Sequence, residues 1–299
     1  MTISRLLIES AFLLKATQIE DPAIEAGLVL SWALKKPSSY IYAHADSVID
    51  HTDEERFMSL IKRRCEGEPF AYITGECEFL SLKFKVNPHV LIPRSDTEIL
   101  AEAAIYALGH DMPFIDEGMY RLNISGKDNK KVLDIGTGSG CLAVGIAHYA
   151  SNAIIDALDI SEEAIRTASE NAVQNCVQTR IRFIRADFLN DSSFSNETYD
   201  LIVSNPPYIP ESEKPDLPIS VKDYEPHTAL FAGNNGYAFF EKIAVLAGKM
   251  LKNDGIIAVE CGYNQADGVR QIFSSRDMET TILKDLAGIT RVIAARRNV

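Results

Sequence analysis

From Lys131 onward, short apolar runs alternate with amphipathic stretches, and this alternation restricts the possible folds more than any other feature of the chain. The runs have the length of buried strands, and the stretches between them, notably 161–175 and 237–252, have helical spacing. Such alternation is typical of a parallel sheet with helices on both faces. The closing β-rich segments, 279–284 and 290–295, are expected to add an antiparallel edge pair. The sequence therefore predicts an α/β fold with a mostly parallel seven-stranded sheet, whose other strands are expected at 132–135, 153–158, 181–185, 200–204 and 256–260.

The first 75 residues have a different pattern and are expected to be helical. Asp21-Pro22 combines a good N-cap residue with proline at the first helical position. The following helix is expected to bury a face formed by Ile24, Leu28, Leu30, Trp32 and Leu34. A further helix is expected from Asp53 to Cys65, with Phe57, Leu60 and Ile61 facing inward.

A linker is expected between these helices and the sheet. Apolar and polar residues alternate with a period of two, which predicts a half-exposed strand of a β-hairpin. The apolar residues of this strand are Leu80, Leu82, Phe84 and Val86. Ser95 and Glu98 fit a capping box that opens a helix ending near Leu108, and 110–130 is expected to be a loop. The predicted domains are a helical domain at 1–75, a hairpin linker at 76–95 and an α/β domain at 96–299.

Composition excludes several classes of protein. A chain of 299 residues can bury a core without disulfide or metal staples. Its cysteines are scattered, without metal-ligand spacing, at Cys65, Cys77, Cys141, Cys176 and Cys261, so no metal site is expected. No apolar run approaches the length of a membrane span, and the N-terminus lacks a cleavage signal. We expect a cytoplasmic protein with no membrane partner.

The net charge of −12 lies mainly in residues 96–299. Proteins that grip a nucleic-acid backbone usually present a basic surface, so no direct nucleic-acid partner is expected, although a local basic patch stays possible. The notable basic cluster, interpreted as a solvated helix face, consists of Arg56, Lys62, Arg63 and Arg64.

A glycine-rich turn follows the first predicted strand of the sheet. The candidate ligand-binding residues in this turn are Asp134, Gly136, Thr137, Gly138, Ser139 and Gly140. Glycines allow positive φ and close approach of a ligand to the backbone. The spacing is Gly-x-Gly-x-Gly, and Cys141 occupies the place where a dinucleotide fingerprint has its third glycine. This spacing favours a ligand whose charged group is an ammonium or sulfonium.

The next two strands end in acidic residues. Asp159 is placed to accept both hydroxyls of a ribose, although it could instead cap the following helix. Asp187 could accept from an adenine amine while Phe188 packs on the ring, although Asp187 could instead be a turn residue. A glycine-rich turn followed by these acids describes an adenosine site without phosphates, and S-adenosylmethionine fits it best.

Asn205-Pro206-Pro207-Tyr208 follows the predicted strand at 200–204. Two prolines cannot continue a sheet ladder, so the chain leaves the sheet in a stiff loop beside the cofactor. The Asn205 side-chain oxygen and the Pro206 carbonyl can accept both hydrogens of one NH2 group, and Tyr208 could pack on the plane of an amide. No strong general base is expected. The alternative is an ordinary strand-to-loop exit.

Together these residues resemble the HemK/PrmC family, the glutamine methyltransferases that modify peptide chain release factors, over nearly the whole chain. The family's linker is resembled by Gly67-Glu68-Pro69, Ile73-Thr74-Gly75, Glu78-Phe79 and Ile92-Pro93-Arg94-Ser95-Asp96-Thr97-Glu98. Its later signature is resembled by Glu225-Pro226, Ala229-Leu230 and Gly236. Two departures are Ser95, where proline is expected, and the long 110–130 segment.

The resemblance implies a Rossmann-like class I methyltransferase domain behind a helical substrate-recognition domain. It implies S-adenosylmethionine as cofactor and the glutamine of the Gly-Gly-Gln loop of release factors as target. We expect a monomer. Asn-Pro-Pro-Tyr also occurs in adenine-N6 DNA methyltransferases and some RNA guanine methyltransferases, and a paralogous class modifies a ribosomal-protein glutamine. These alternatives stay open, whereas Cys141 disfavours a nicotinamide oxidoreductase.

Overall fold

The structure is a computed structural model that describes residues 1–17, 19–112, 117–126, 128–190 and 198–297. Contacts within the chain divide it into two units. Unit 1 comprises Met1–Gly75 with Asp216–Tyr224, and unit 2 comprises Glu76–Pro215 with Glu225–Val299. Unit 1 therefore takes up a short segment of the region that the sequence assigned to the α/β domain.

Unit 1 is helical, with α1 (Ile3–Leu14), α2 (Pro22–Leu34), α3 (Ser38–Ala43), α4 (His51–Cys65), α5 (Phe70–Thr74) and α9 (Ile219–Lys222). Two contacts attach the distant segment to this unit. Ile219 lies against Gly67, and the hydroxyl of Tyr224 donates to the Glu66 carbonyl at 3.1 Å. The inward residues predicted for α4 are buried, as expected, at Phe57, Leu60 and Ile61.

The inward face predicted for α2 is wrong at several positions. Ile24 is 57% exposed and Leu28 is 40% exposed. The residues that α2 buries are mostly smaller and comprise Ala26, Gly27, Val29, Leu30 and Ala33. Small side chains let α2 approach α1 and α4 closely, so they occupy the contact and the larger side chains remain outside. Pro22 opens the helix as predicted, but the Asp21 side chain makes no capping hydrogen bond.

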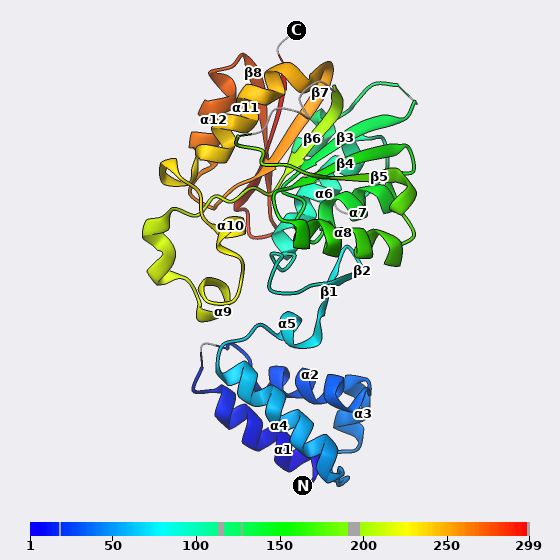
Figure 1. Ribbon diagram of the computed structural model, residues 1–299, viewed down its shortest axis with the longest axis vertical. Helices are drawn as coiled ribbons and strands as arrows, with labels where there is room; N and C mark the ends of the chain where they lie inside the picture. Colours follow the sequence, from blue (N-terminus) through cyan, green and yellow to red (C-terminus); the bar gives the residue numbers. More distant parts are fainter. Residues whose placement is uncertain (18, 113–116, 127, 191–197, 298–299) are drawn as a thin grey trace. The chain divides into compact units, whose positions relative to one another are not determined.

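The centre of unit 2 is a seven-stranded sheet, which confirms the predicted fold class (Figure 1). Its strands are β3 (Lys130–Ile135), β4 (Ala153–Asp159), β5 (Ile181–Arg185), β6 (Tyr199–Ser204), β7 (Leu251–Glu260), β8 (Met278–Lys284) and β9 (Thr290–Arg297). They lie in the order β5-β4-β3-β6-β7-β9-β8. β3 to β7 pair in parallel, and β9 pairs antiparallel with both β7 and β8, so the predicted edge pair is present.

Helices cover both faces of the sheet. On one face the core includes residues of α6 (Ser95–Ala107), α7 (Cys141–Tyr149) and α8 (Glu162–Gln174). On the other face it includes residues of α11 (Ala238–Met250) and α12 (Ala266–Ser274). Successive strand residues alternate between the two cores, as Val132 and Leu133 do, because strand side chains have a period of two. The shorter elements of unit 2 are η1 (Glu117–Arg121), η2 (Gln178–Arg180), α10 (His227–Leu230), η4 (Asn234–Gly236) and η3 (Glu211–Asp216), whose last residue belongs to unit 1.

The linker hairpin is present, but its turn lies where a strand was predicted to begin. β1 (Glu76–Phe79) and β2 (Leu82–Lys85) pair antiparallel around Leu80 and Ser81. Both turn residues have positive φ, 50° and 59°, the combination that a type I′ turn requires. The apolar pattern alone could not reveal this turn, because neither residue is glycine or asparagine.

The predicted capping box at the start of α6 is wrong. Arg94 is the N-cap residue, and Ser95 already has a helical position. Glu98 is engaged elsewhere, because its Oε1 accepts from the backbone N–H of Leu80 at 2.7 Å. A tertiary contact with the hairpin turn has replaced the local cap.

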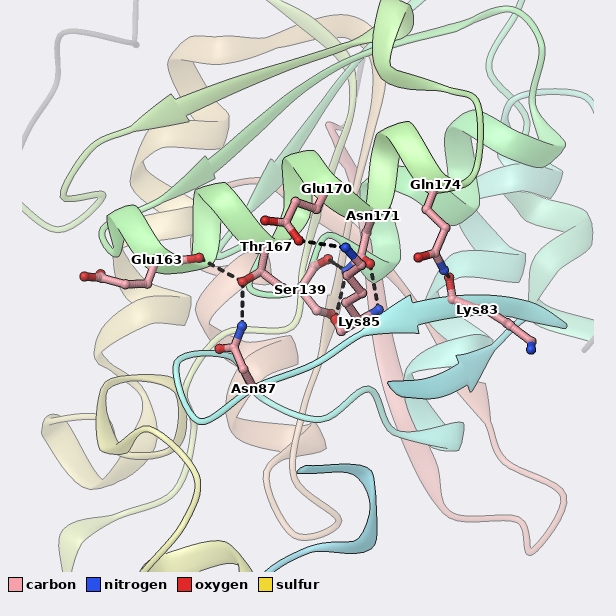
Figure 2. A network of polar contacts seen from close by, with 9 residues as sticks. All are labelled: Lys83, Lys85, Asn87, Ser139, Glu163, Thr167, Glu170, Asn171 and Gln174. Atoms are coloured by element: carbon pink, nitrogen blue, oxygen red, sulfur yellow. Dashed lines mark hydrogen bonds and ion pairs between the residues drawn. The ribbon is translucent and has the colours of Figure 1, made fainter. Parts of the chain in front are cut away.

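Asn171 of α8 attaches the hairpin to the α/β core (Figure 2). Its Oδ1 accepts from the Lys85 N–H at 2.7 Å, and its Nδ2 donates to the Lys85 carbonyl at 3.0 Å. The same Nδ2 donates to the Ser139 carbonyl at 2.8 Å. A further hydrogen bond to α8 joins Asn87 Nδ2, just after the hairpin, to Thr167 Oγ1 at 2.9 Å. One fully buried carboxamide therefore joins β2, α8 and the glycine-rich turn.

The segment at 110–130 is more structured than predicted. It contains η1, and three of its side chains, Met119, Leu122 and Ile124, are buried in the core. Part of this prediction, at 113–116 and 127, lies outside the described residues. Lys130, at its end, already belongs to β3.

Candidate active site

A cavity of about 370 Å³ lies at the carboxyl edge of the sheet. Its lining includes residues that follow β3, β4, β5 and β6. From β3 the chain adds β4 and then β5 on one side and returns to place β6 on the other side, so the strand order reverses between β3 and β6. Open α/β sheets bind ligands at such a switch point. The Ser204 hydroxyl, which donates to the Ile135 carbonyl at 2.7 Å, joins the two strand ends there.

The glycine-rich turn forms one wall of the cavity. Gly138 has φ +55°, and a Cβ at this position would lie 4.0 Å from its nearest contact, the Gly136 carbonyl oxygen, so the space beside it is open to a ligand. Gly140 serves packing instead, because a Cβ at this position would lie 2.9 Å from the Ala168 Cβ of α8. Its φ of +80° is also unfavourable for residues with a side chain. Gly136, Thr137 and Ser139 also line the cavity.

Asp134 lies beneath the turn and is fully buried. Its Oδ2 accepts from the Thr137 hydroxyl at 2.6 Å. Burial raises the pKa of Asp134 to about 7, because a carboxylate is poorly solvated there, and the hydrogen bond from Thr137 opposes this effect. Among the described residues, Asp134 Oδ1 and Ser139 Oγ are buried without a hydrogen-bond partner, so the turn has polar capacity left for a ligand or water.

Asp159 lines the cavity at the end of β4. Its Oδ2 accepts from the Gly138 N–H and its Oδ1 from the Ser161 N–H, both at 2.9 Å. Each carboxylate oxygen can accept two hydrogen bonds, so one position on each remains for a diol. Burial raises the pKa of Asp159, and these backbone hydrogen bonds oppose the effect.

Asp187 and Phe188 line the cavity after β5. Asp187 also has the turn role that the sequence left open, because its Oδ1 accepts from the Leu189 N–H at 3.0 Å. Its Oδ2 accepts from Asn190 Nδ2 at 2.8 Å. The hydrogen bond from Asn190 is the largest of the effects that lower the pKa of Asp187, so the group is an anion at neutral pH. Phe188 is 5% exposed and offers an apolar ring surface.

Asn205, Pro206 and Pro207 line the cavity after β6. Both prolines are buried and hold the exit loop. Asn205 Nδ2 donates to Thr97 Oγ1 at 3.0 Å, which directs the amide nitrogen towards α6. The structure thus brings residues of all three predicted groups, the turn, the two strand-end acids and the Asn-Pro-Pro loop, to one cavity.

Three predicted site residues, Asp134, Gly140 and Tyr208, are not among the described residues that line the cavity. The Tyr208 hydroxyl donates to Glu260 Oε1 at 3.3 Å, and its carbonyl accepts from Gln265 Nε2 at 2.9 Å. Burial raises the pKa of Tyr208, and the nearby Glu260 carboxylate adds to this effect.

Sequence reasoning missed three charged or polar residues around the site. Glu260 ends β7 as Asp159 ends β4, so the rule that selected Asp159 could have found it. Thr97 and Arg94 lie in the linker motif, and Arg94 forms an ion pair with buried Glu225. These pairings join residues far apart in the sequence, which local patterns do not reveal.

Within the described ranges, no cluster of His, Cys, Asp and Glu could hold a metal ion. In the same part of the chain, no helix has both the length and the hydropathy to cross a bilayer.

Comparison with known proteins gives two family models. The model described as PrmC N-terminal domain matches residues 5–75, and the one described as methyltransferase small domain matches 115–217. A release factor glutamine methyltransferase of Clostridium acetobutylicum is 36% identical over 300 residues, covering 99% of both chains. A bifunctional methyltransferase of Rickettsia bellii is 37% identical over 303 residues, covering 98% of this chain and 54% of that protein. This chain thus spans about half the length of the Rickettsia relatives that it matches.

Among solved structures, the hMettl16 catalytic domain, in complex with the MAT2A 3′UTR hairpin 6, has a TM-score of 0.55 at 14% identity. The match covers 84% of this chain and 83% of that domain. At this identity it shows a similar fold. The sheet, its switch-point cavity and these matches define the chain as an α/β methyltransferase. Its full-length match to the Clostridium enzyme is more specific. The chain belongs to the family of release factor glutamine methyltransferases.

Proposed function

We propose that the protein transfers a methyl group from S-adenosylmethionine to the side-chain amide nitrogen of a glutamine. The glutamine is that of the Gly-Gly-Gln motif of peptide chain release factors. The observation that carries this proposal is the orientation of the Asn205 carboxamide. Its Nδ2 donates a hydrogen bond to Thr97, so its Oδ1 is available to accept from the NH2 group of an amide in the cavity.

The residues present fit this cofactor. Asp159 would accept from the ribose hydroxyls, and Phe188 would pack on the adenine. The open space beside Gly138 would admit the ligand against the backbone, and the buried Asp134 carboxyl below the turn suits a cationic group. A volume of about 370 Å³ is within the range of small-molecule sites. When bound, the cofactor would supply a methyl group activated by its sulfonium.

The residues of the chain would mainly position and polarise the acceptor. An amide nitrogen is a poor nucleophile because its lone pair is delocalised into the carbonyl. Asn205 Oδ1 and the Pro206 carbonyl would accept from the two N–H groups and stabilise the positive charge that develops on nitrogen. Such alignment lowers the barrier by reducing the entropy lost in reaching the transition state. The Asn-Pro-Pro-Tyr motif contains no His, Cys or Lys, so the proton would leave to water.

The test offers labelled cofactor in parallel to a release factor, the same factor with its motif glutamine replaced, a ribosomal protein, DNA and RNA. Label is expected on the unmodified release factor alone. Asn205→Ala should lower kcat by about 10²–10³-fold, as removal of one preorganised polar group does, while affinity for the release factor changes much less. Label on the ribosomal protein alone would instead indicate the paralogous activity. Label on nucleic acid with none on protein would contradict the proposal.

A further inference from the structure

A series of three hydrogen bonds leads from Asn205 through Thr97, which also lines the cavity, to a buried carboxylate. Asn205 Nδ2 donates to Thr97 Oγ1 at 3.0 Å, and Thr97 Oγ1 donates to Glu260 Oε2 at 2.6 Å. The other carboxylate oxygen, Oε1, accepts from the Tyr208 hydroxyl at 3.3 Å. We call these residues, Asn205, Thr97, Glu260 and Tyr208, the amide relay.

The relay is internal. Thr97, in the first turn of α6, and Glu260, at the end of β7, are each 2% exposed. β7 lies beside β6, so the carboxylate of Glu260 comes close to the loop that carries Asn205. An acidic side chain is rarely buried without a role, because its charged form loses its hydration. The cavity mechanism leaves Glu260 without a direct contact to the reacting groups, so its role requires another explanation.

The relay has a chemical direction. An ionised carboxylate can only accept, so Glu260 fixes the Thr97 hydrogen on the bond between them. The Thr97 oxygen then presents only lone pairs to Asn205, and the part of Asn205 that faces it must be the NH2 group. The amide oxygen of Asn205, which lines the cavity, is thereby left without a bond to Thr97 and can accept from the NH2 group of a substrate amide. With the hydrogen of Thr97 free, Asn205 could turn over and present its own NH2 group to the substrate amine, which would be repelled.

We propose that Thr97 and Glu260 are positioning residues that fix the orientation of the Asn205 carboxamide, so that its oxygen can accept hydrogen bonds from the NH2 group of a substrate amide. This inference rests on the proposed role of Asn205 as the acceptor. It assigns Thr97 and Glu260 no contact with the reacting atoms.

The surroundings of Glu260 make the relay sensitive to pH. Burial raises the pKa of Glu260 to about 7, the hydrogen bond from Thr97 opposes this effect, and the Asp96 carboxylate adds to it. The Tyr208 hydroxyl and the Arg291 guanidinium favour the charged form, and Arg291 is itself paired with Asp96 and Asp285. Above this pKa the carboxylate holds the hydrogen of Thr97. Below it, the carboxyl can donate to Thr97, and the direction of the relay is lost.

The experiment compares Thr97→Val, Thr97→Ser and Glu260→Gln with the wild type, in the full chain with a release factor as substrate. By analogy with residues that orient the ligands of a metal, Thr97→Val should lower kcat by about 10–100-fold, with little change in cofactor affinity. Thr97→Ser keeps the hydroxyl and should restore most of kcat. Wild-type kcat should fall as the pH decreases through about 7, and Glu260→Gln should have a low kcat without this acidic limb.

The outcomes separate the relay from the function on which it rests. If Asn205→Ala is inactive while Thr97→Val is fully active, the positioning role of Thr97 is wrong but the acceptor role of Asn205 stands. If Asn205→Ala is itself fully active, the acceptor role is wrong. If Thr97→Val does not fold, the pH profile decides. The profile is measured with the cofactor saturating, because its cationic group would hold the Asp134 carboxyl, whose pKa is also about 7, in the charged form. Under these conditions, loss of the acidic limb in Glu260→Gln supports the relay, and retention of that limb overturns it.

Discussion

At the scale of single residues, several side chains of this site have two tasks. Asp159 lines the cavity and also holds the Gly138 N–H, so the group that would bind ribose also shapes the turn beside it. Asp187 is engaged in its own turn and lines the cavity as well. The binding roles predicted for these acids are therefore best tested by substitutions that keep their shape.

Asp159→Asn should weaken the binding of S-adenosylmethionine by about 1.5–3 kcal/mol, because a hydrogen bond to a charged acceptor is worth that amount and the amide has one acceptor fewer. Calorimetry measures the change. Glu162→Gln is the matched control, since it removes the same charge from an exposed side chain three residues further on, paired with Arg185. Equal weakening in both variants, or tight binding of NAD by the wild type, would contradict the predicted role.

At the scale of elements, the hairpin linker is held by side-chain carboxamides of α8. Asn171 satisfies both backbone groups of Lys85 and the Ser139 carbonyl from a fully buried position. Asn175, the C-cap residue of α8 one turn later, is half-buried and donates to the exposed Lys83 carbonyl at 3.0 Å. The two asparagines make the same kind of contact and differ in burial, so they form a natural comparison.

Asn171→Ala should lower the free energy of unfolding of unit 2 by about 2–3 kcal/mol, because it leaves buried backbone groups unpaired. Asn175→Ala should cost about 0.5 kcal/mol or less, since the Lys83 carbonyl lies at the surface and keeps the hydrogen bond from Gln174 Nε2 at 2.9 Å. Urea unfolding and the exchange rate of the Lys85 amide hydrogen measure the two effects. Similar losses in both variants would show that burial does not decide the strength of this attachment.

At the scale of the whole molecule, unit 1 exposes large apolar side chains although it has its own core. Ile8 and Phe12 lie one turn apart on α1, and they are 69% and 76% exposed. Adjacent exposed apolar residues mark interaction surfaces more often than single ones do. We therefore expect this face of α1 to contact the protein substrate, in line with the recognition role predicted for the helical domain.

Replacing Ile8 and Phe12 together by alanine should raise KM for the release factor by about 10-fold, the effect of losing roughly 1.4 kcal/mol of interface contact. kcat and cofactor affinity should not change, because both residues lie outside the unit that contains the cavity. Leu286→Ala is the control, since Leu286 is an exposed apolar residue of unit 2. Steady-state kinetics with varied release factor would contradict this prediction if KM were unchanged, or if Leu286→Ala raised it equally.

The sequence by itself determined the layered α/β fold, the parallel strands and the antiparallel edge. It also identified Gly138, Asp159 and Asn205 as residues that meet at one cavity. These features depend on short-range signals: apolar periodicity, glycine at a turn and polar residues at strand ends. Parallel strands bring their carboxyl ends to one edge, so separate local signals pointed to a common site.

The tertiary structure decided which residues pair with partners that are distant in the sequence, because local sequence patterns do not encode such contacts. Glu98 binds the backbone of the hairpin turn instead of capping its own helix, and α2 packs through its small residues while Ile24 stays exposed. Thr97 and Glu260 meet across 163 positions of the sequence. In each case the packing of elements distant in the sequence selected the partner, and local patterns do not encode that packing.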